Sequence, residues 1–239
     1  MFMKIIAHRG WSGKYPENTM LAFKSAVDAG CDGIELDVHL SRDGEVMIIH
    51  DEKLIRTTGM SGVVSDYTRA ELEKINAGKT KDDKYGFTPI PSLEEYLDYI
   101  SRCPVVTNIE LKTAPTYYPR IEEKTLKLIE SFGCQGKFFF SSFNWLSLMK
   151  IKMLDPSYRC GTLIEKPRIL NIGHQLGNIG FECYHPDFNL IDEEAVKECH
   201  LHDVEVNVWT VNDESDMLKC KAWNVDGLIT NNPDIAKRI

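Results

Sequence analysis

The stretch KFFFSSFNWLSLMKIKMLDPSYRCGTLI, residues 137–164, decides the fold. It opens with an apolar run at Lys137–Phe143, which predicts a strand. A helical segment follows at Trp145–Leu154 and ends before Pro156, because proline cannot continue a helix. Arg159–Ile164 predicts a second strand. A strand, a helix and a strand in this order are typical of a βαβ unit with parallel strands.

The same alternation recurs along the rest of the chain. Strands are expected at Lys4–Arg9, Gly33–Leu40, Glu45–His50, Val105–Lys112, Cys183–Phe188, Glu205–Val211 and Gly227–Thr230, and helices at Thr19–Ala29, Tyr117–Phe132, Asp192–His200 and Asp213–Trp223. Roughly eight βα units fit a doubly wound sheet or a closed barrel. We expect a (β/α)₈ TIM barrel, because the units continue to the last residues and polar side chains recur at strand ends throughout. A doubly wound sheet would gather its ligand contacts at one switch point.

One segment, Asp51–Pro91, departs from this rhythm. It has few apolar runs and is rich in Gly, Thr and Ser, and one short helix is expected in it at Arg69–Ile75, capped by Thr68. No linker or low-complexity tract sets it apart. We therefore expect residues 1–239 to form a single barrel domain, with an insertion at about 51–91 that lies over the top face.

Composition excludes several classes of protein. The 28 basic and 36 acidic residues give a net charge of −8, which argues against a nucleic-acid-binding protein. We find no apolar run long enough for a transmembrane segment and no signal-peptide pattern. The seven cysteines are scattered without a Cys-x-x-Cys pair, which indicates free thiols. We expect a cytoplasmic protein with a small-molecule substrate; the sequence leaves homo-oligomer formation open.

Chemistry-bearing side chains lie at the ends of the first two expected strands. His8 and Arg9 pair a group that transfers protons with one that binds anions, although neighbouring carboxylates could instead satisfy both. Glu35 and Asp37 are two residues apart on one strand, so they share a face. Two carboxylates inside a barrel need a divalent cation or basic partners; the alternative is a solvated edge strand.

Two further strand ends add to this set. His50 ends an apolar strand, and Glu110 and Lys112 share a face of another, either as site residues or as a self-satisfied ion pair. Three carboxylates favour Mg²⁺, Ca²⁺ or Mn²⁺ over zinc. A basic pair beside such a metal can hold phosphate oxygens, and two histidines can serve as base and acid. This set of groups suits cleavage of an alkyl phosphodiester.

The order of these motifs resembles the glycerophosphodiester phosphodiesterase family. The matching motifs are AHRG (7–10), PENT (16–19) with Ala22 and Phe23, GIELDV (33–38), RDG (42–44) leading to HD (50–51), IELK (109–112), SSF (141–143), VWTVN (208–212) and DGLITN (226–231). They run in the expected order from residue 4 to about residue 235. One departure is His39-Leu40-Ser41, where the family often has a Thr before the Asp-Gly turn.

The resemblance implies a TIM barrel with a small insertion after the early strands. It implies hydrolysis of glycerophosphodiesters, such as glycerophosphocholine or glycerophosphoethanolamine, to glycerol 3-phosphate and an alcohol. It also implies roles for individual residues: Glu35, Asp37 and Glu110 as ligands of one divalent cation (Mg²⁺ or Ca²⁺, with Mn²⁺ as a further candidate), His8 and His50 as the acid–base pair, Arg9 and Lys112 as phosphate-binding groups, Glu17 and Asn18 as residues that shape the substrate site, and Trp209 against the substrate. Trp209 could equally be a core residue of the barrel.

Two other functions compete with this one. A phospholipase D- or C-like enzyme acting on lysophospholipids would call for an exposed apolar ridge near the mouth. Residues 51–91 offer only Tyr67, Tyr85 and Phe87 among charged residues, which favours a water-soluble substrate. A catalytically inactive barrel used as a binding module is the other alternative. The presence of all seven polar candidates argues against it, because binding alone would not need both histidines.

Overall fold

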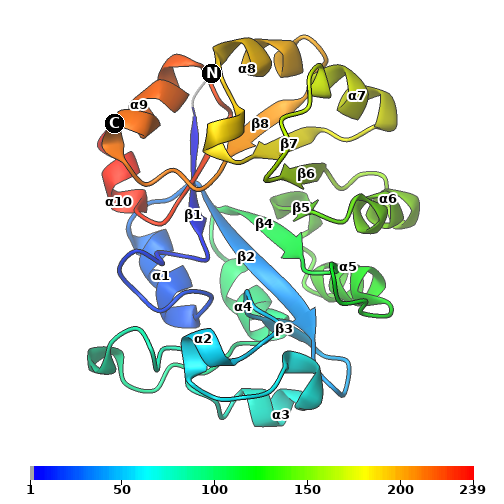
Figure 1. Cartoon of the computed structure of the whole chain (residues 1–239). Coiled ribbons are helices and arrows are strands. Elements are labelled where there is room, and N and C mark those ends of the chain that lie inside the picture. The colour runs from blue at the N-terminus through cyan, green and yellow to red at the C-terminus, as the bar shows by residue number, and fades with distance from the viewer. Residues whose placement is uncertain (1–2) are drawn as a thin grey trace.

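The computed structural model describes residues 3–239, in which eight parallel strands close into a ring (Figure 1). The strands are β1 (Lys4–His8), β2 (Gly33–Leu40), β4 (Val106–Leu111), β5 (Phe138–Ser142), β6 (Cys160–Ile164), β7 (Cys183–Pro186), β8 (Glu205–Val208) and β9 (Gly227–Thr230). The ring closes because β1 pairs in parallel with both β2 and β9. The expectation of a (β/α)₈ barrel is therefore confirmed.

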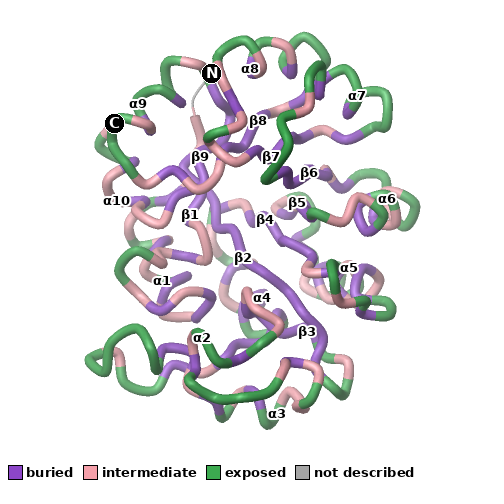
Figure 2. Tube along the Cα trace, in the orientation of Figure 1, coloured by how far each residue is buried: buried purple, intermediate pink, exposed green. Residues whose placement is uncertain are grey.

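Helices surround the ring and cover it from solvent. They are α1 (Met20–Asp28), α4 (Leu93–Ile100), α5 (Ile121–Ser131), α6 (Trp145–Leu154), α7 (Ile172–Ile179), α8 (Glu193–His200), α9 (Glu214–Ala222) and α10 (Pro233–Ala236). Figure 2 shows the strands largely buried and the outer faces of the helices exposed. Thr19 caps α1, since its hydroxyl accepts a hydrogen bond from the Ala22 N–H at 3.2 Å.

Helices α4 and α7 were not expected from the sequence. In α4 the buried residues Leu93, Tyr96, Leu97 and Ile100 have helical spacing, but the helix is only eight residues long. Helix α7 contains two glycines, which oppose helix formation. A Cβ on one of them, Gly173, would lie 2.5 Å from the Cα of Cys199 in α8. The close packing of α7 on α8 therefore requires this residue.

Two expected boundaries also differ from the structure. Helix α5 begins at Ile121, four residues later than expected, because Arg120 adopts a left-handed backbone conformation with φ of 65°. Strand β3 (Val46–Ile48) pairs antiparallel with β2 outside the ring, with Val38 opposite Ile48. The chain leaves the sheet beyond Ile48, so His50 reaches the barrel from the following turn.

The segment after β3 folds around its own small core. It contains α2 (Ile55–Thr58) and α3 (Arg69–Leu72), the latter capped by Thr68 as expected. Short 3-10 turns lie at Val64–Asp66, Asp83–Tyr85, Gln135–Lys137 and Phe188–Leu190. The small core consists of buried Met47, Ile49, Leu54, Val64, Leu72, Ile75, Ala77 and Ile90.

The position of this segment differs from the expected one. It lies beside β3 rather than across the mouth of the barrel (Figure 1). At the carboxyl ends of the strands it contacts the loop after β1; Lys81 Nζ, for example, donates to the Ser12 carbonyl at 2.8 Å. The expected place over the top face was therefore wrong for most of the segment, because its apolar residues pack against β3.

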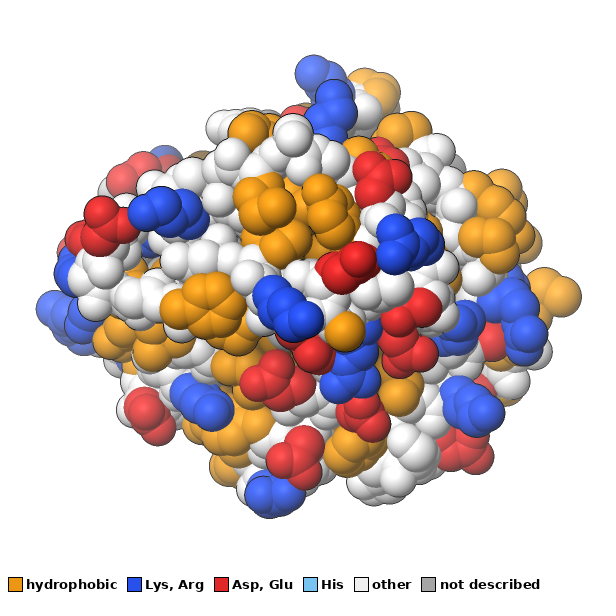
Figure 3. Space-filling view, turned by 90° about the horizontal axis from the view of Figure 1, so that it is seen from below, with side chains coloured by type: hydrophobic (Ala, Val, Ile, Leu, Met, Phe, Trp, Pro, Cys, Tyr) orange, Lys and Arg blue, Asp and Glu red, His pale blue; other side chains and the backbone are white. Residues whose placement is uncertain are grey.

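Charged side chains of both signs lie on the surface. On the face shown in Figure 3, basic side chains are interspersed with acidic ones. Between residues 3 and 239, no helix has both the length and the apolar character that a membrane span needs.

Candidate active site

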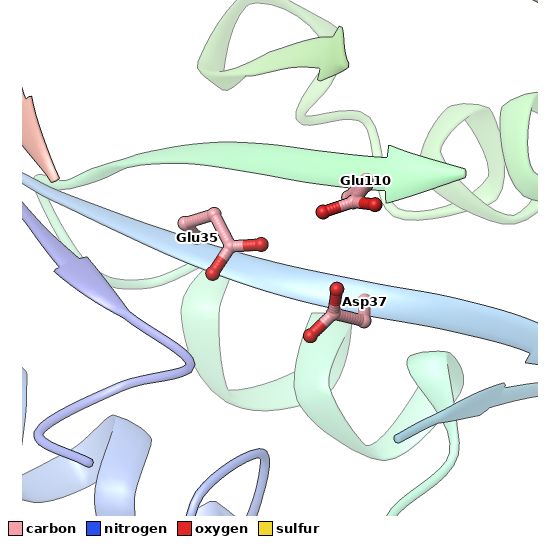
Figure 4. A group of neighbouring side chains, drawn as sticks. All are labelled: Glu35, Asp37 and Glu110. Atoms are coloured by element: carbon pink, nitrogen blue, oxygen red, sulfur yellow. The ribbon is translucent and has the colours of Figure 1, made fainter. Parts of the chain in front are cut away.

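Three buried carboxylates meet on the inner face of two adjacent strands. Glu35 and Asp37 come from β2 and Glu110 comes from β4. Strand register places Asp37 directly beside Glu110. One oxygen from each side chain lies within 4.8 Å of the others, and Figure 4 shows the three groups pointing toward one another. The i, i+2 spacing in β2 therefore directs both of its carboxylates into the barrel, as expected.

Two cations face these carboxylates. Lys112 Nζ lies 2.6 Å from Glu110 Oε1 and 3.0 Å from Asp37 Oδ1. Arg9 donates its backbone N–H to Glu35 Oε2 at 2.9 Å, and its Nε lies 3.4 Å from Asp37 Oδ2. Two positive charges thus oppose three buried carboxyl groups, which leaves an excess of negative charge when all three are ionised.

Burial and the excess of negative charge shift the pKa values of the carboxyl groups. Burial and the charges of Asp37 and Glu110 raise the pKa of Glu35 well above its ordinary value. Burial also raises the pKa of Glu110 to about 7, against the opposing charge of Lys112. Despite burial, Lys112 and Arg9 hold the pKa of Asp37 well below its usual range. A bound divalent cation would relieve the repulsion that these shifts express, and three carboxylate oxygens are ligands that Mg²⁺, Ca²⁺ and Mn²⁺ prefer. The residues present therefore fit such an ion.

His8 faces the carboxylates from the end of β1. Its Nδ1 lies 2.7 Å from Asn231 Oδ1, and its Nε2 lies 4.0 Å from Glu35 Oε2. Because an amide oxygen only accepts, Nδ1 donates and Nε2 carries the free lone pair. Burial, followed by the charge of Arg9, lowers the pKa of His8 to about 4, so its imidazole is neutral.

His50 has a different partner. Its Nδ1 lies 2.6 Å from Asp51 Oδ1, and the backbone carbonyl of His50 contacts His39 Nε2 at 3.0 Å. Burial lowers the pKa of His50, and the neighbouring Asp51 carboxylate acts in the opposite direction. His39 is buried and also contacts the Tyr118 hydroxyl at 3.0 Å. It fixes the turn that carries His50.

Glu17 and Asn18 support the site from behind. Asn18 donates from Nδ2 to Asp37 Oδ2 at 2.7 Å. Glu17 accepts from Arg9 NH1 at 2.9 Å and from both terminal nitrogens of Arg56 at 2.7 and 2.8 Å. Arg56 Nε also donates to the Asp51 carboxylate. This network links the first βα loop, helix α2 and His50.

A cavity of about 330 Å³ opens between these groups. Its lining includes seven of the residues singled out from the sequence: His8, Arg9, Glu35, His50, Glu110, Lys112 and Trp209. Asp37, Glu17 and Asn18 are not among the residues of 3–239 that line it. Trp209 is thus a pocket residue rather than one confined to the barrel core.

The sequence analysis assigned no role to several other lining residues. Asn108, Ser141, Phe143, Leu163 and Glu165 also border the cavity. Phe143 and Glu165 directly follow β5 and β6, so the strand-end rule that found the other site residues could have found both. Arg56 gave no such signal, because it lies in the irregular segment.

Comparisons with known proteins agree with this geometry. The model of the glycerophosphoryl diester phosphodiesterase family matches residues 8–235. A glycerophosphodiester phosphodiesterase of Bacillus altitudinis is 40% identical over 243 residues, covering 99% of this chain and 97% of that protein. One of Caldanaerobacter subterraneus subspecies tengcongensis is 38% identical over 230 residues, covering 96% and 94%.

A solved structure is similar over almost the whole chain. It is an Oleispira antarctica phosphodiesterase in complex with the product sn-glycerol-3-phosphate, with 30% identity and a TM-score of 0.89. The match covers 98% of this chain and 95% of that one. Sequence, fold and site thus lead to the same assignment: the chain belongs to the glycerophosphoryl diester phosphodiesterase family and is a phosphoric diester hydrolase.

Proposed function

We propose that the chain hydrolyses glycerophosphodiesters to glycerol 3-phosphate and an alcohol, with one divalent cation and a pair of histidines. The observation that carries this proposal is the arrangement around a single cavity of three converging carboxylates, two cations and two histidines. The likeness to the Oleispira antarctica phosphodiesterase, whose structure contains sn-glycerol-3-phosphate, supports this substrate class.

The phosphate group is bound by Arg9 and Lys112. Both side chains line the cavity and are largely buried, so water does not screen their charges strongly. Glu35, Asp37 and Glu110 would hold the divalent cation, Mg²⁺ or Ca²⁺ with Mn²⁺ as a further candidate, which supplies charge stabilisation at the phosphate oxygens. Glu17 and Asn18 contribute by holding the guanidinium of Arg9 and the carboxylate of Asp37 in place.

His8 acts as the general base. Asn231 Oδ1 accepts a hydrogen bond from the Nδ1–H of His8, which leaves Nε2 free to take a proton from the attacking hydroxyl. That hydroxyl belongs either to water or to the neighbouring carbon of the substrate's glycerol, and both routes use the same base. In the second route the alcohol leaves from a cyclic glycerol phosphate, which water then opens to glycerol 3-phosphate. The depressed pKa of His8, about 4, keeps it unprotonated at neutral pH.

His50 acts as the general acid. The alcohol leaves as a poor alkoxide unless it receives a proton. Asp51 accepts a hydrogen bond from Nδ1 of His50 and opposes the lowering of the His50 pKa by burial, and Nε2 faces the cavity as the proton donor. Protonation of the leaving oxygen and deprotonation of the nucleophile thus fall to two histidines with different partners.

A second candidate substrate class is favoured by one observation. Exposed apolar side chains lie on the loops or first helical turn after three consecutive barrel strands: Tyr117 after β4, Phe143 and Leu146 after β5, and Leu170 after β6. Exposed apolar side chains at these strand ends suit contact with the acyl chain of a lysophospholipid. Parallel assays with glycerophosphocholine and lysophosphatidylcholine rank the two substrate classes.

The test is an assay that couples glycerol 3-phosphate release to its oxidation, across several glycerophosphodiesters. We expect product from the metal-loaded protein, loss of activity in chelator, and recovery with Mg²⁺ or Ca²⁺. Glu35→Gln serves as the site-directed negative control. Absence of glycerol 3-phosphate from every diester, in the presence of Mg²⁺, Ca²⁺ and Mn²⁺ in turn, would contradict the proposal.

A further inference from the structure

Two aromatic side chains line the cavity from the half of the ring formed by β5 to β8, whereas the three carboxylates come from β2 and β4. Phe143 follows β5 and Trp209 follows β8, and both border the cavity. Their rings meet edge to face with centroids 5.8 Å apart. The indole is fixed, since Trp209 Nε1 donates to the His185 carbonyl at 2.8 Å. Two aromatic rings thus form a defined surface beside the phosphate-binding groups.

A carboxylate borders the same cavity. Glu165 directly follows Ile164, the last residue of β6, and is exposed. The Ile164 carbonyl accepts from the Asp187 N–H at 3.0 Å, and Asp187 forms a parallel bridge with Trp209. The end of β7 therefore connects the segment that carries Glu165 with the segment that carries Trp209.

Glu165 is free to meet a ligand. Over residues 3–239 it has no hydrogen bond or ion pair through its carboxylate. Arg168, a nearby cation of the same loop, is held by both carboxylate oxygens of Asp192 at 2.6 and 2.9 Å. Lys166 is the adjacent residue and is exposed to solvent. The negative charge of Glu165 therefore lies at the cavity without a fixed partner.

The two halves of the ring thus present different groups to the cavity. Arg9 and Lys112 follow β1 and β4 and suit a phosphate anion. The aromatic faces and the unpaired carboxylate follow β5, β6 and β8 and attract an organic cation, above all a quaternary ammonium. A substrate that carries a phosphate and, a few bonds away, an ammonium group would match both sets of groups.

We propose that Glu165, Phe143 and Trp209 form a subsite for a cationic head group, which makes this chain selective for diesters of choline and ethanolamine. This inference rests on the proposed hydrolysis of glycerophosphodiesters and specifies its substrate. Glu165 supplies the charge and the two rings supply the apolar surface that a methylated ammonium contacts. Selectivity is the ratio of two kcat/KM values, one for a cationic and one for a neutral head group.

The test compares Glu165→Gln with the wild-type protein on glycerophosphocholine and glycerophosphoglycerol. The ratio of kcat/KM between these substrates should fall about 3–10-fold in the variant, as expected for the loss of one exposed charge contact. Glu165→Lys should lower the ratio further. Glu194 is an exposed carboxylate in the first turn of α8, and Glu194→Gln is the matched control. This variant should keep the wild-type ratio of kcat/KM between the two substrates. Added salt should reduce the ratio in the wild type and have less effect in Glu165→Gln.

Several outcomes would overturn the subsite. One is an unchanged ratio in both Glu165 variants. Another is an equal loss on both substrates, which would mean that Glu165 contacts the glycerol they share. If the wild type releases glycerol 3-phosphate from neither diester, the proposed function fails instead. Calorimetric binding of glycerophosphocholine to wild type and Glu165→Gln then still tests the subsite, and equal affinities would refute it.

Discussion

Glu110→Gln should be more stable than the wild type in chelator, and less stable than the wild type when a divalent cation is added. Without metal, burial and the charge of Asp37 raise the pKa of Glu110 to about 7. A raised carboxyl pKa means that the folded state binds this proton more tightly than the unfolded state does. The wild type therefore loses stability as pH rises from the ordinary value of 4.5 through about 7, and the cost is fully present at pH 8.

The size of the effect follows from the shift. One pKa unit corresponds to about 1.4 kcal/mol, and Lys112 loses one of its two carboxylate partners in the variant. The net gain on removing the charge is then on the order of 1–3 kcal/mol in chelator. For a chain of this length, about 1 kcal/mol moves the unfolding midpoint by roughly 2–4 °C. Glu110→Gln should therefore melt several degrees above the wild type in chelator at pH 8.

Metal should invert this order. An ion present at one hundred times its dissociation constant stabilises the wild type by about 2.7 kcal/mol, or roughly 5–10 °C. Glu110→Gln retains only two of the three carboxylates, so it binds less metal at the same concentration and gains less. The wild type should then melt above the variant.

The assay is thermal unfolding at pH 8 in chelator and in a series of Mg²⁺ and Ca²⁺ concentrations. Glu122→Gln is the matched control, because Glu122 is buried but is bound by Lys150 Nζ and the Ser147 hydroxyl at 3.0 and 2.8 Å, away from the cavity. It should be destabilised to the same extent with and without metal. A wild type whose midpoint ignores both ions, or a Glu110→Gln protein that gains as much from metal as the wild type, would refute the reasoning.

Three further outcomes follow from the site and the core. His50→Ala should be roughly 10²–10⁴-fold impaired on glycerophosphocholine but much less on a nitrophenyl diester, while His8→Ala should be impaired on both; the opposite pattern would exchange their roles. Arg56→Gln should lower kcat several-fold and the free energy of unfolding by only about 1 kcal/mol, because the arginine is 44% exposed. Arg56→Lys should not restore kcat, since one ammonium cannot replace the planar contacts to Glu17, and full restoration would show that charge alone matters. Burial lowers the pKa of His185 to about 3, so its contribution to stability is complete above pH 6.5 and is lost as pH falls toward 3. The free energy of unfolding in urea should therefore depend less on pH between pH 6 and 4 in His185→Gln than in the wild type. An unchanged pH dependence would contradict this.

The parts of the fold that the sequence predicts are those where local pattern and tertiary packing agree. The strand expected at Lys137–Phe143 and the helix expected at Trp145–Leu154 match β5 and α6 almost to the residue. The sequence does not predict helix α7, because its two glycines lower its helix propensity and one of them, Gly173, is required for close packing on α8. The segment after β3 has its own core, and nothing in its irregular pattern indicates which side of the barrel that core faces.

The site also has a part that the sequence predicts and a part that it does not. Strand periodicity alone places Glu35, Asp37 and Glu110 together, because parallel strands in register bring their carboxyl ends to one rim. Arg56 lies in a segment without a periodic pattern, yet it joins Glu17 to the Asp51 carboxylate. Such contacts depend on loop packing, so the sequence carries no local signal for them.

The two histidines show why these contacts matter for chemistry. By sequence they are equivalent, each a histidine following an apolar run. In the structure His8 donates to the Asn231 amide oxygen, which fixes a tautomer without stabilising a positive charge. His50 contacts the Asp51 carboxylate, which opposes the lowering of the His50 pKa by burial, whereas an amide oxygen offers no such charge to His8. A general base must begin neutral and a general acid must begin protonated. The hydrogen-bond partners of the two histidines therefore determine which one serves as the base and which one as the acid.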